Sequence, residues 1–189
     1  MIVSEILSIL DARSFASPWF WLVLVSLWTL AGRGALGVPN DVLARAGQAL
    51  RNAEDADPEG AHLLLDWLSL QLPRWQISPG MGAVLTGAAA FGLTTLALLG
   101  FRYQLEMAQA LTLLFAPFAL LLVLKLRLAR QLGWVMEAAH LGQPARVASI
   151  EAMRRINRYR LQHTVISLLA VTLTAFWAAR WMAFHPNGM

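Results

Sequence analysis

The stretch PGMGAVLTGAAAFGLTTLALLGF, residues 79–101, contains no charged side chain. A helix needs roughly 20 mostly apolar residues to cross a hydrocarbon core of about 30 Å, so this stretch predicts a transmembrane helix. Composition agrees, because 58% of the chain is hydrophobic and only 14% is charged. Soluble domains carry about 25% charged residues. The predicted fold class is therefore an all-α integral membrane protein.

Three more segments are apolar enough to span a bilayer, which gives four predicted transmembrane helices in a single membrane domain, residues 1–189. The other three predicted spans are residues 18–38, 107–124 and 164–184. The first has the shortest apolar run, Trp19 to Ala31, so its helix must continue past Arg33 to span.

The remaining segments predict helices outside the hydrocarbon core. Residues 39–78 contain two short amphipathic patterns that suit the membrane interface. Residues 125–163 predict a helical hairpin that extends the spanning helices into water and breaks at Gly142 and Pro144. Residues 2–13 predict a further short interfacial helix.

The basic residues predict the orientation in the membrane. Twelve of the 15 Lys and Arg side chains lie in residues 33–77 and 125–163, at and between the inner ends of the spans. Only three lie on the other side. Because Lys and Arg are retained in the cytoplasm, segments 39–78 and 125–163 are predicted to be cytoplasmic, with both termini periplasmic.

Small residues in the second span predict close helix packing. They are Gly82, Ala83, Gly87, Ala88 and Gly92, of which Ala83 with Gly87 and Ala88 with Gly92 are four residues apart. Such pairs let a second backbone approach closely in lipid. The partner is either another helix of this chain or a helix of another subunit, and the sequence leaves both open.

The residues needed for common chemistry are missing from the sequence. There is no cysteine, which excludes disulfides, thiol nucleophiles and thiolate metal sites. None of the four histidines lies in the middle of a predicted span, and no nucleophile elbow, phosphate loop or zinc-protease motif occurs. We therefore predict a protein that is not an enzyme and has no cofactor or metal site.

A basic cluster, MRRINRYRLQH at residues 153–163, is the strongest concentration of charge. It predicts that Arg154, Arg155, Arg158 and Arg160 contact anionic lipids of the inner leaflet or, alternatively, an acidic patch on a cytoplasmic partner. Nucleic acid is not a predicted partner, because the bases lie beside apolar segments. Trp67 and Trp75 are predicted at the same interface.

Three charged residues are predicted at the outer ends of the spans. Arg102 and Glu106 are spaced for an i, i+4 pair, and Arg180 near the end of the fourth span is an alternative partner for Glu106. The expected role of the carboxylate is structural.

Three stretches resemble a small family of bacterial inner-membrane proteins. They are DARSFASPWFWLVL (11–24), LGVPND (36–41) and LALLGFRYQLEMAQAL (96–111). Members are often labelled components of the SufBCD iron–sulfur assembly complex, and the resemblance implies a docking role, since no cysteine is present to ligate a cluster. The predicted function is a non-catalytic accessory or assembly subunit of a larger bacterial inner-membrane complex. The alternative is a small transporter or channel component.

Overall fold

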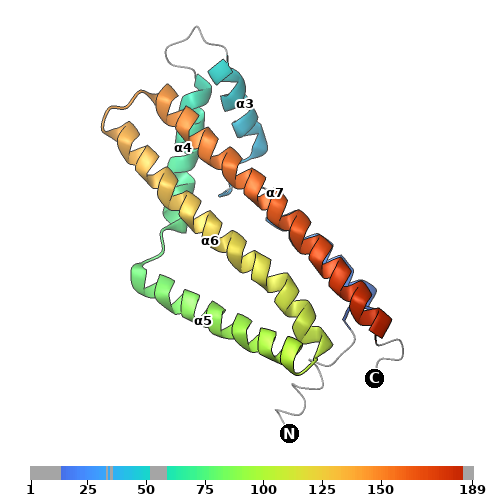
Figure 1. Cartoon of the computed structure of the whole chain (residues 1–189). Helices are drawn as coiled ribbons and strands as arrows, with labels where there is room; N and C mark the ends of the chain where they lie inside the picture. Colours follow the sequence, from blue (N-terminus) through green and yellow to red (C-terminus); the bar gives the residue numbers. More distant parts are fainter. Residues whose placement is uncertain (1–13, 33, 35, 52–58, 185–189) are drawn as a thin grey trace. The chain divides into compact units, whose positions relative to one another are not determined.

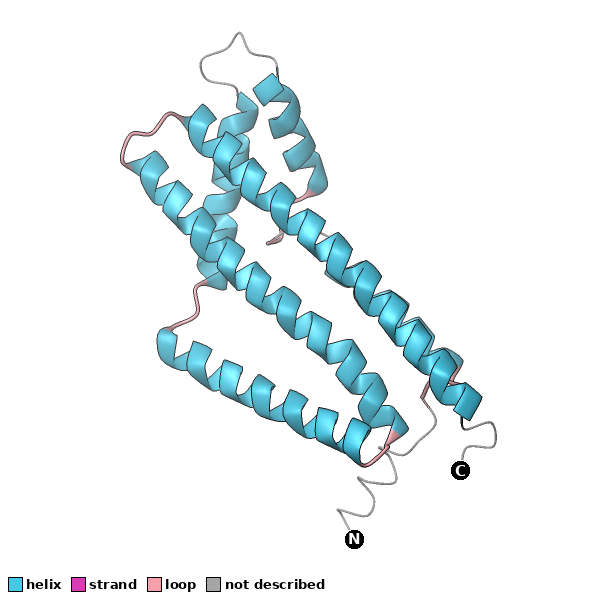
Figure 2. Ribbon diagram, in the orientation of Figure 1, coloured by secondary structure: helices cyan, strands magenta, loops and turns pink. Residues whose placement is uncertain are grey.

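A computed structural model describes residues 14–32, 34, 36–51 and 59–184, and every regular element in these ranges is a helix (Figures 1 and 2). The elements in order are α2 (Pro18–Ala31), α3 (Asn40–Arg51), α4 (Glu59–Gln71), the 3-10 helix η1 (Leu72–Trp75), α5 (Pro79–Ala97), the π-helix η2 (Leu98–Arg102), α6 (Glu106–His140) and α7 (Ala145–Phe184). The predicted all-α class is confirmed. The helix predicted at residues 2–13 lies outside the described residues.

Three helical segments are long and apolar enough to cross a membrane, namely Pro79–Arg102, Glu106–His140 and Ala145–Phe184. As predicted, α6 continues well beyond residue 124, and α7 begins long before residue 164. Both helices therefore carry an apolar part and a polar part. The chain is an all-helical protein with the lengths and composition of a membrane protein.

The helix α2 is shorter than the predicted span 18–38, because it ends at Ala31. The backbone beyond it cannot continue a right-handed helix, since φ is +56° at Leu36 and +83° at Gly37. With 14 residues in total, α2 is shorter than the three helical segments named above. The predicted extension to Val38 is therefore wrong.

The described chain forms two compact units. Unit 2 comprises Ala31–Ser78 and Leu122–Thr164, and its core joins α3, α4 and the adjacent parts of α6 and α7. Leu64, Leu68, Leu132 and Ile156 are fully buried in this core. The core of unit 2 therefore resembles the core of an ordinary helical bundle.

Unit 1 comprises the described parts of residues 1–30, 79–121 and 165–189. Its packing joins α2 to the first half of α6 and the second half of α7. Trp28 of α2 lies against Phe118 of α6, with ring centroids 4.7 Å apart. Phe15, which precedes α2, is almost completely buried next to Ala110 and Ala178.

The helix α5 connects to α6 through a tight turn. Gly100 in η2 is buried against the start of α6, and a Cβ atom there would lie 2.7 Å from the backbone nitrogen of Gln109. The chain then turns through Gln104, which has a φ of +60°. Only glycine permits this contact, so Gly100 sets how closely the turn approaches α6.

Candidate interaction surfaces

The Glu106 carboxylate links three parts of unit 1 at the start of α6. Its Oε1 accepts the backbone N–H groups of Ser14 at 2.7 Å and Phe15 at 2.6 Å. Its Oε2 accepts the indole N–H of Trp181 at 3.1 Å. The Trp21 indole in turn donates to the Phe15 carbonyl at 3.0 Å. One carboxylate thus fixes the segment before α2 against α6 and the end of α7.

Gln109, one turn further along α6, is fully buried and forms two side-chain hydrogen bonds. Its Nε2 donates to the Gly100 carbonyl at 2.9 Å, and its Oε1 accepts the Trp177 indole N–H at 2.8 Å. A buried amide without hydrogen-bond partners lowers the stability of the fold, so these two bonds stabilise the contact of η2, α6 and α7. The side-chain amide of Gln109 thus has a hydrogen-bond partner at both its nitrogen and its oxygen.

The two arginines predicted near Glu106 do not pair with it in the described part of the chain. Arg102 is exposed in η2, and no ion pair joins it to Glu106. The Arg180 guanidinium lies 5.7 Å from the ring centre of Trp177 and 5.8 Å from that of Phe184. The structure therefore brings Arg180 to aromatic rings.

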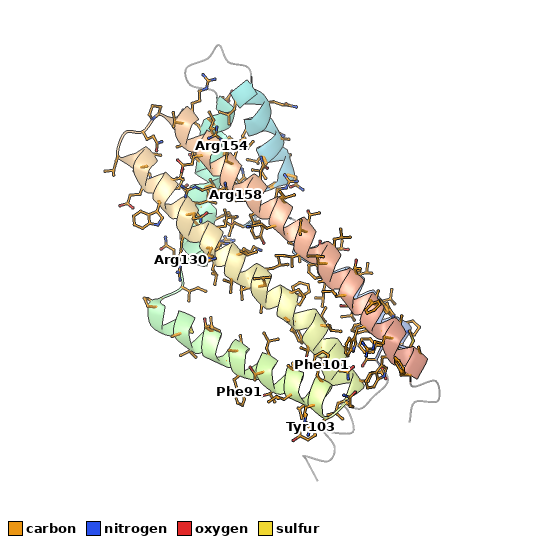
Figure 3. The ribbon with its side chains drawn as sticks, in the orientation of Figure 1. Phe91, Phe101, Tyr103, Arg130, Arg154 and Arg158 are labelled. Carbon is orange, nitrogen blue, oxygen red and sulfur yellow. The ribbon has the colours of Figure 1, made fainter. Side chains whose placement is uncertain are left out.

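The small-residue face predicted on α5 is open. No residue of α5 is buried, and a Cβ atom added at Gly87 or Gly92 would meet nothing within 4 Å. Ala83 and Ala88 are also exposed, and Gly82 is partly exposed. Phe91 on α5 points away from α6, and 76% of its surface is exposed (Figure 3). Among residues 14–32, 36–51 and 59–184, therefore, no helix packs closely on this face.

The four arginines of the basic cluster separate into two groups in unit 2. Arg155 bonds to the Glu151 carboxylate and donates to the Gln131 carbonyl at 2.6 Å, which ties α7 to α6. Arg154, Arg158 and Arg160 are exposed, and Figure 3 shows the first two along α7. Only these three are free to contact a lipid surface or a partner.

Exposed basic and aromatic residues also follow one face of α6 in unit 2. Arg127, Arg130 and Trp134 are exposed, and their spacing of three and four residues places them on the same side of the helix. The charge bias that predicts the membrane orientation includes Arg127 and Arg130, but it does not show that they share a face with Trp134. The spacing of these three residues in the sequence is the signal that could have identified the face.

The predicted interfacial tryptophans pack inward. Trp67 and Trp75 are partly buried against the unit 2 core. The Lys125 ammonium lies 4.6 Å from the ring centre of Trp75, and burial lowers the pKa of this lysine. Burial and then the charge of Lys125 also lower the pKa of His163. Burial raises the pKa of Tyr159, whose ring faces that of His163.

These groups do not form a constellation typical of catalysis or metal binding. Among the described residues, no three His, Asp or Glu side chains are grouped as metal ligands would be. Burial is the largest cause of the pKa shift at each of the three groups, and the charge of Lys125 adds a smaller cause at His163. The described residues instead present exposed apolar and basic surfaces on α5, α6 and α7.

Comparisons of the chain with protein-family models, with curated proteins and with solved structures found no match. The resemblance of residues 11–24, 36–41 and 96–111 to a bacterial inner-membrane family therefore stays a prediction.

Proposed function

We propose that this chain is a non-catalytic accessory or assembly subunit that docks on a larger membrane complex through α5. One observation carries the proposal: α5 is a 19-residue apolar helix with no buried residue, although the rest of the described chain has packed cores. In lipid, association of helices depends on close packing rather than on the hydrophobic effect. Small residues left open on a spanning helix support such packing.

Two pairs of small residues lie on different sides of α5. Ala83 and Gly87 share one side of the helix, while Ala88 and Gly92 lie roughly opposite. The side with Ala88 and Gly92 is the better docking face, because the other side is continuous with the residues that face α6. We therefore place the partner helix on Ala88 and Gly92.

Co-purification in mild detergent tests the docking. Leucine at Gly92 would keep the backbone of a partner helix away, so Gly92→Leu should abolish recovery of the partner. Gly133→Leu is the matched control, because Gly133 also has open space but lies on α6 in unit 2. A wild-type protein that runs alone, or equal recovery with both variants, contradicts the proposal.

The proposed topology has four spans in a bacterial inner membrane, with α2 crossing despite its 14 residues and both termini in the periplasm. The charge distribution supports it, since Arg154, Arg158 and Arg160 are exposed on the side proposed to be cytoplasmic. Reporter fusions at Met1 and in the turn at Gly142 test it. We expect opposite sides, and the same side for both would leave only three spans.

A further inference from the structure

An open groove of about 640 Å³ lies in unit 1 between the end of α5 with η2 and the first half of α6. Its apolar lining comes from Leu93, Ala97, Leu98 and Phe101 on one side and Ala116 on the other. Ala97 and Ala116 have small side chains, and they leave room where larger residues would fill the space. A volume in this range suits a single small ligand or chain.

A positive charge lies at one end of the groove. Arg102 lines it and comes last in the chain order of its α5–η2 wall, so the charge is nearest the turn into α6. The nearest acidic residue in the sequence, Glu106, accepts hydrogen bonds from Ser14, Phe15 and Trp181 instead. Among the described residues, therefore, no carboxylate forms an ion pair with Arg102.

Besides Arg102, the polar residues that line the groove are Thr94 on α5 and Thr112 on α6. The Thr112 hydroxyl donates to the carbonyl of Ala108 at 2.7 Å, as threonines in membrane helices commonly do, so this group is occupied within its own helix. The groove thus combines an apolar channel with one guanidinium at its end. Guanidinium groups bind phosphate through paired N–H donors, and apolar channels between helices accept acyl chains.

We infer that this groove binds one anionic phospholipid, with its phosphate on Arg102 and an acyl chain along Leu93 and Leu98. The inference requires that α5 and α6 lie in a bilayer, but it does not depend on the docking face at Ala88 and Gly92. Neither of these two residues lines the groove. A failure of the docking proposal therefore leaves the lipid site testable, and the reverse is also true.

Native mass spectrometry of the delipidated full chain tests the inference. Phosphatidylglycerol and phosphatidylcholine with the same acyl chains are added separately, and the bound fraction is measured. We expect tighter binding of phosphatidylglycerol, and roughly fivefold weaker binding of it in Arg102→Gln, the effect of about one charge at an anionic lipid. Ala116→Leu should also weaken binding, because the leucine would fill the groove from an exposed position.

Arg180→Gln is the matched control, because it removes another exposed arginine that does not line the groove. We expect it to bind phosphatidylglycerol as the wild type does. Equal loss in Arg102→Gln and Arg180→Gln would mean general attraction to charge and would overturn the site. So would equal binding of the two lipids.

Two further outcomes separate other occupants. Phosphatidylglycerol should remain bound in excess inorganic phosphate, and complete displacement would assign Arg102 to a free anion and overturn the lipid site. If Ala116→Leu keeps phosphatidylglycerol but loses a co-purifying protein, a partner helix occupies the groove and the inference is wrong. Circular dichroism of each variant, compared with the wild type, verifies that the helices form.

Discussion

The helices α4 and α5, which lie close together in the sequence, are both rich in apolar residues. They differ in how many of these residues are buried. The 13-residue α4 buries Ala61, Leu64, Leu65 and Leu68, and it exposes Asp66 and Ser69 on the other side. The 19-residue α5 buries nothing, and it has no charged residue to expose. A helix with one apolar side and one polar side is packed against protein and faces water.

The two units also differ in how much apolar surface they leave exposed. In unit 2 most of the apolar side chains of α3 and α4 pack into one core with parts of α6 and α7, and exposed arginines lie on the outside together with exposed apolar residues such as Trp134 and Leu141. In unit 1 large apolar side chains such as Phe91, Leu168 and Phe176 stay exposed. An apolar surface of this extent is stable when its surroundings are lipid or another protein. The same chain therefore combines a packed helical core in unit 2 with long apolar helices in unit 1 that leave much of their surface exposed.

Truncation of one leucine in each helix is the most severe test of this comparison. Leu64 on α4 is fully buried, whereas Leu85 on α5 is 51% exposed. Leu64→Ala should lower the free energy of unfolding by about 2–5 kcal/mol, because it removes contacts and leaves a cavity. Leu85→Ala should change it by less than about 0.5 kcal/mol. Unfolding titrations in one detergent measure both, and similar losses would break the comparison.

Loss of the Glu106 carboxylate is expected to be the next largest effect. In Glu106→Ala, the backbone N–H groups of Ser14 and Phe15 and the Trp181 indole lose their acceptor. Hydrogen bonds to a charged group contribute about 1.5–3 kcal/mol, and unfolding in detergent should show a loss of that order. Glu106→Gln should lose less, because it keeps an acceptor oxygen.

The same series tests the ion pair predicted from the sequence. If the carboxylate acts through the N–H groups, Arg180→Gln should leave the unfolding free energy nearly unchanged. Exchange of the two residues, Glu106→Arg with Arg180→Glu, should then not restore stability. Rescue by the exchange would show that the ion pair is the stabilising contact after all.

Alanine substitutions at Gly100 in η2 and at Gly87 in α5 should change the free energy of unfolding in opposite directions. At Gly100, a Cβ atom would lie 2.7 Å from the nitrogen of Gln109 and 3.0 Å from the Ala108 carbonyl carbon, both in the backbone. Gly100→Ala should therefore destabilise unit 1 by about 1–3 kcal/mol. Gly87→Ala meets open space and should stabilise α5 by up to about 1 kcal/mol. Equal tolerance of both would contradict the tight turn.

The positions of most helices follow from local features of the sequence. Ser78 and Pro79 mark the start of α5, and Gly142 with Pro144 separates α6 from α7. The end of α2 was missed, because a leucine with positive φ at position 36 gives no signal of its own. The nearby Gly34 and Gly37 are the signal that could have indicated it.

The contacts of the polar cluster could not be predicted from the sequence. The partners of Glu106 are backbone groups 91 and 92 residues away, and a backbone N–H leaves no trace in the residue type. Gln109 looks like any polar residue in the first turn of a helix until its partners Gly100 and Trp177 are known. Tertiary contacts of this kind depend on how helices meet, which periodicity does not describe.

The smallest expected effect concerns His163, in unit 2 just outside the fourth predicted span. Its pKa lies below the ordinary value of 6.5 because of burial, and then because of the charge of Lys125. As pH falls below 6.5, the unfolded chain takes up a proton on this residue before the folded chain does, so folding stability decreases. The loss continues until the lowered folded-state pKa is passed.

His163→Gln should therefore flatten the dependence of unfolding free energy on pH below neutrality. Lys125→Met should flatten it less, because burial is the larger cause and the charge the smaller. Unfolding titrations at a series of pH values measure both slopes. If the slope is unchanged in His163→Gln, the protonation of this histidine does not limit the stability of unit 2. If Lys125→Met flattens it more than His163→Gln does, the order of the two causes is reversed, and the ammonium next to Trp75 carries the effect.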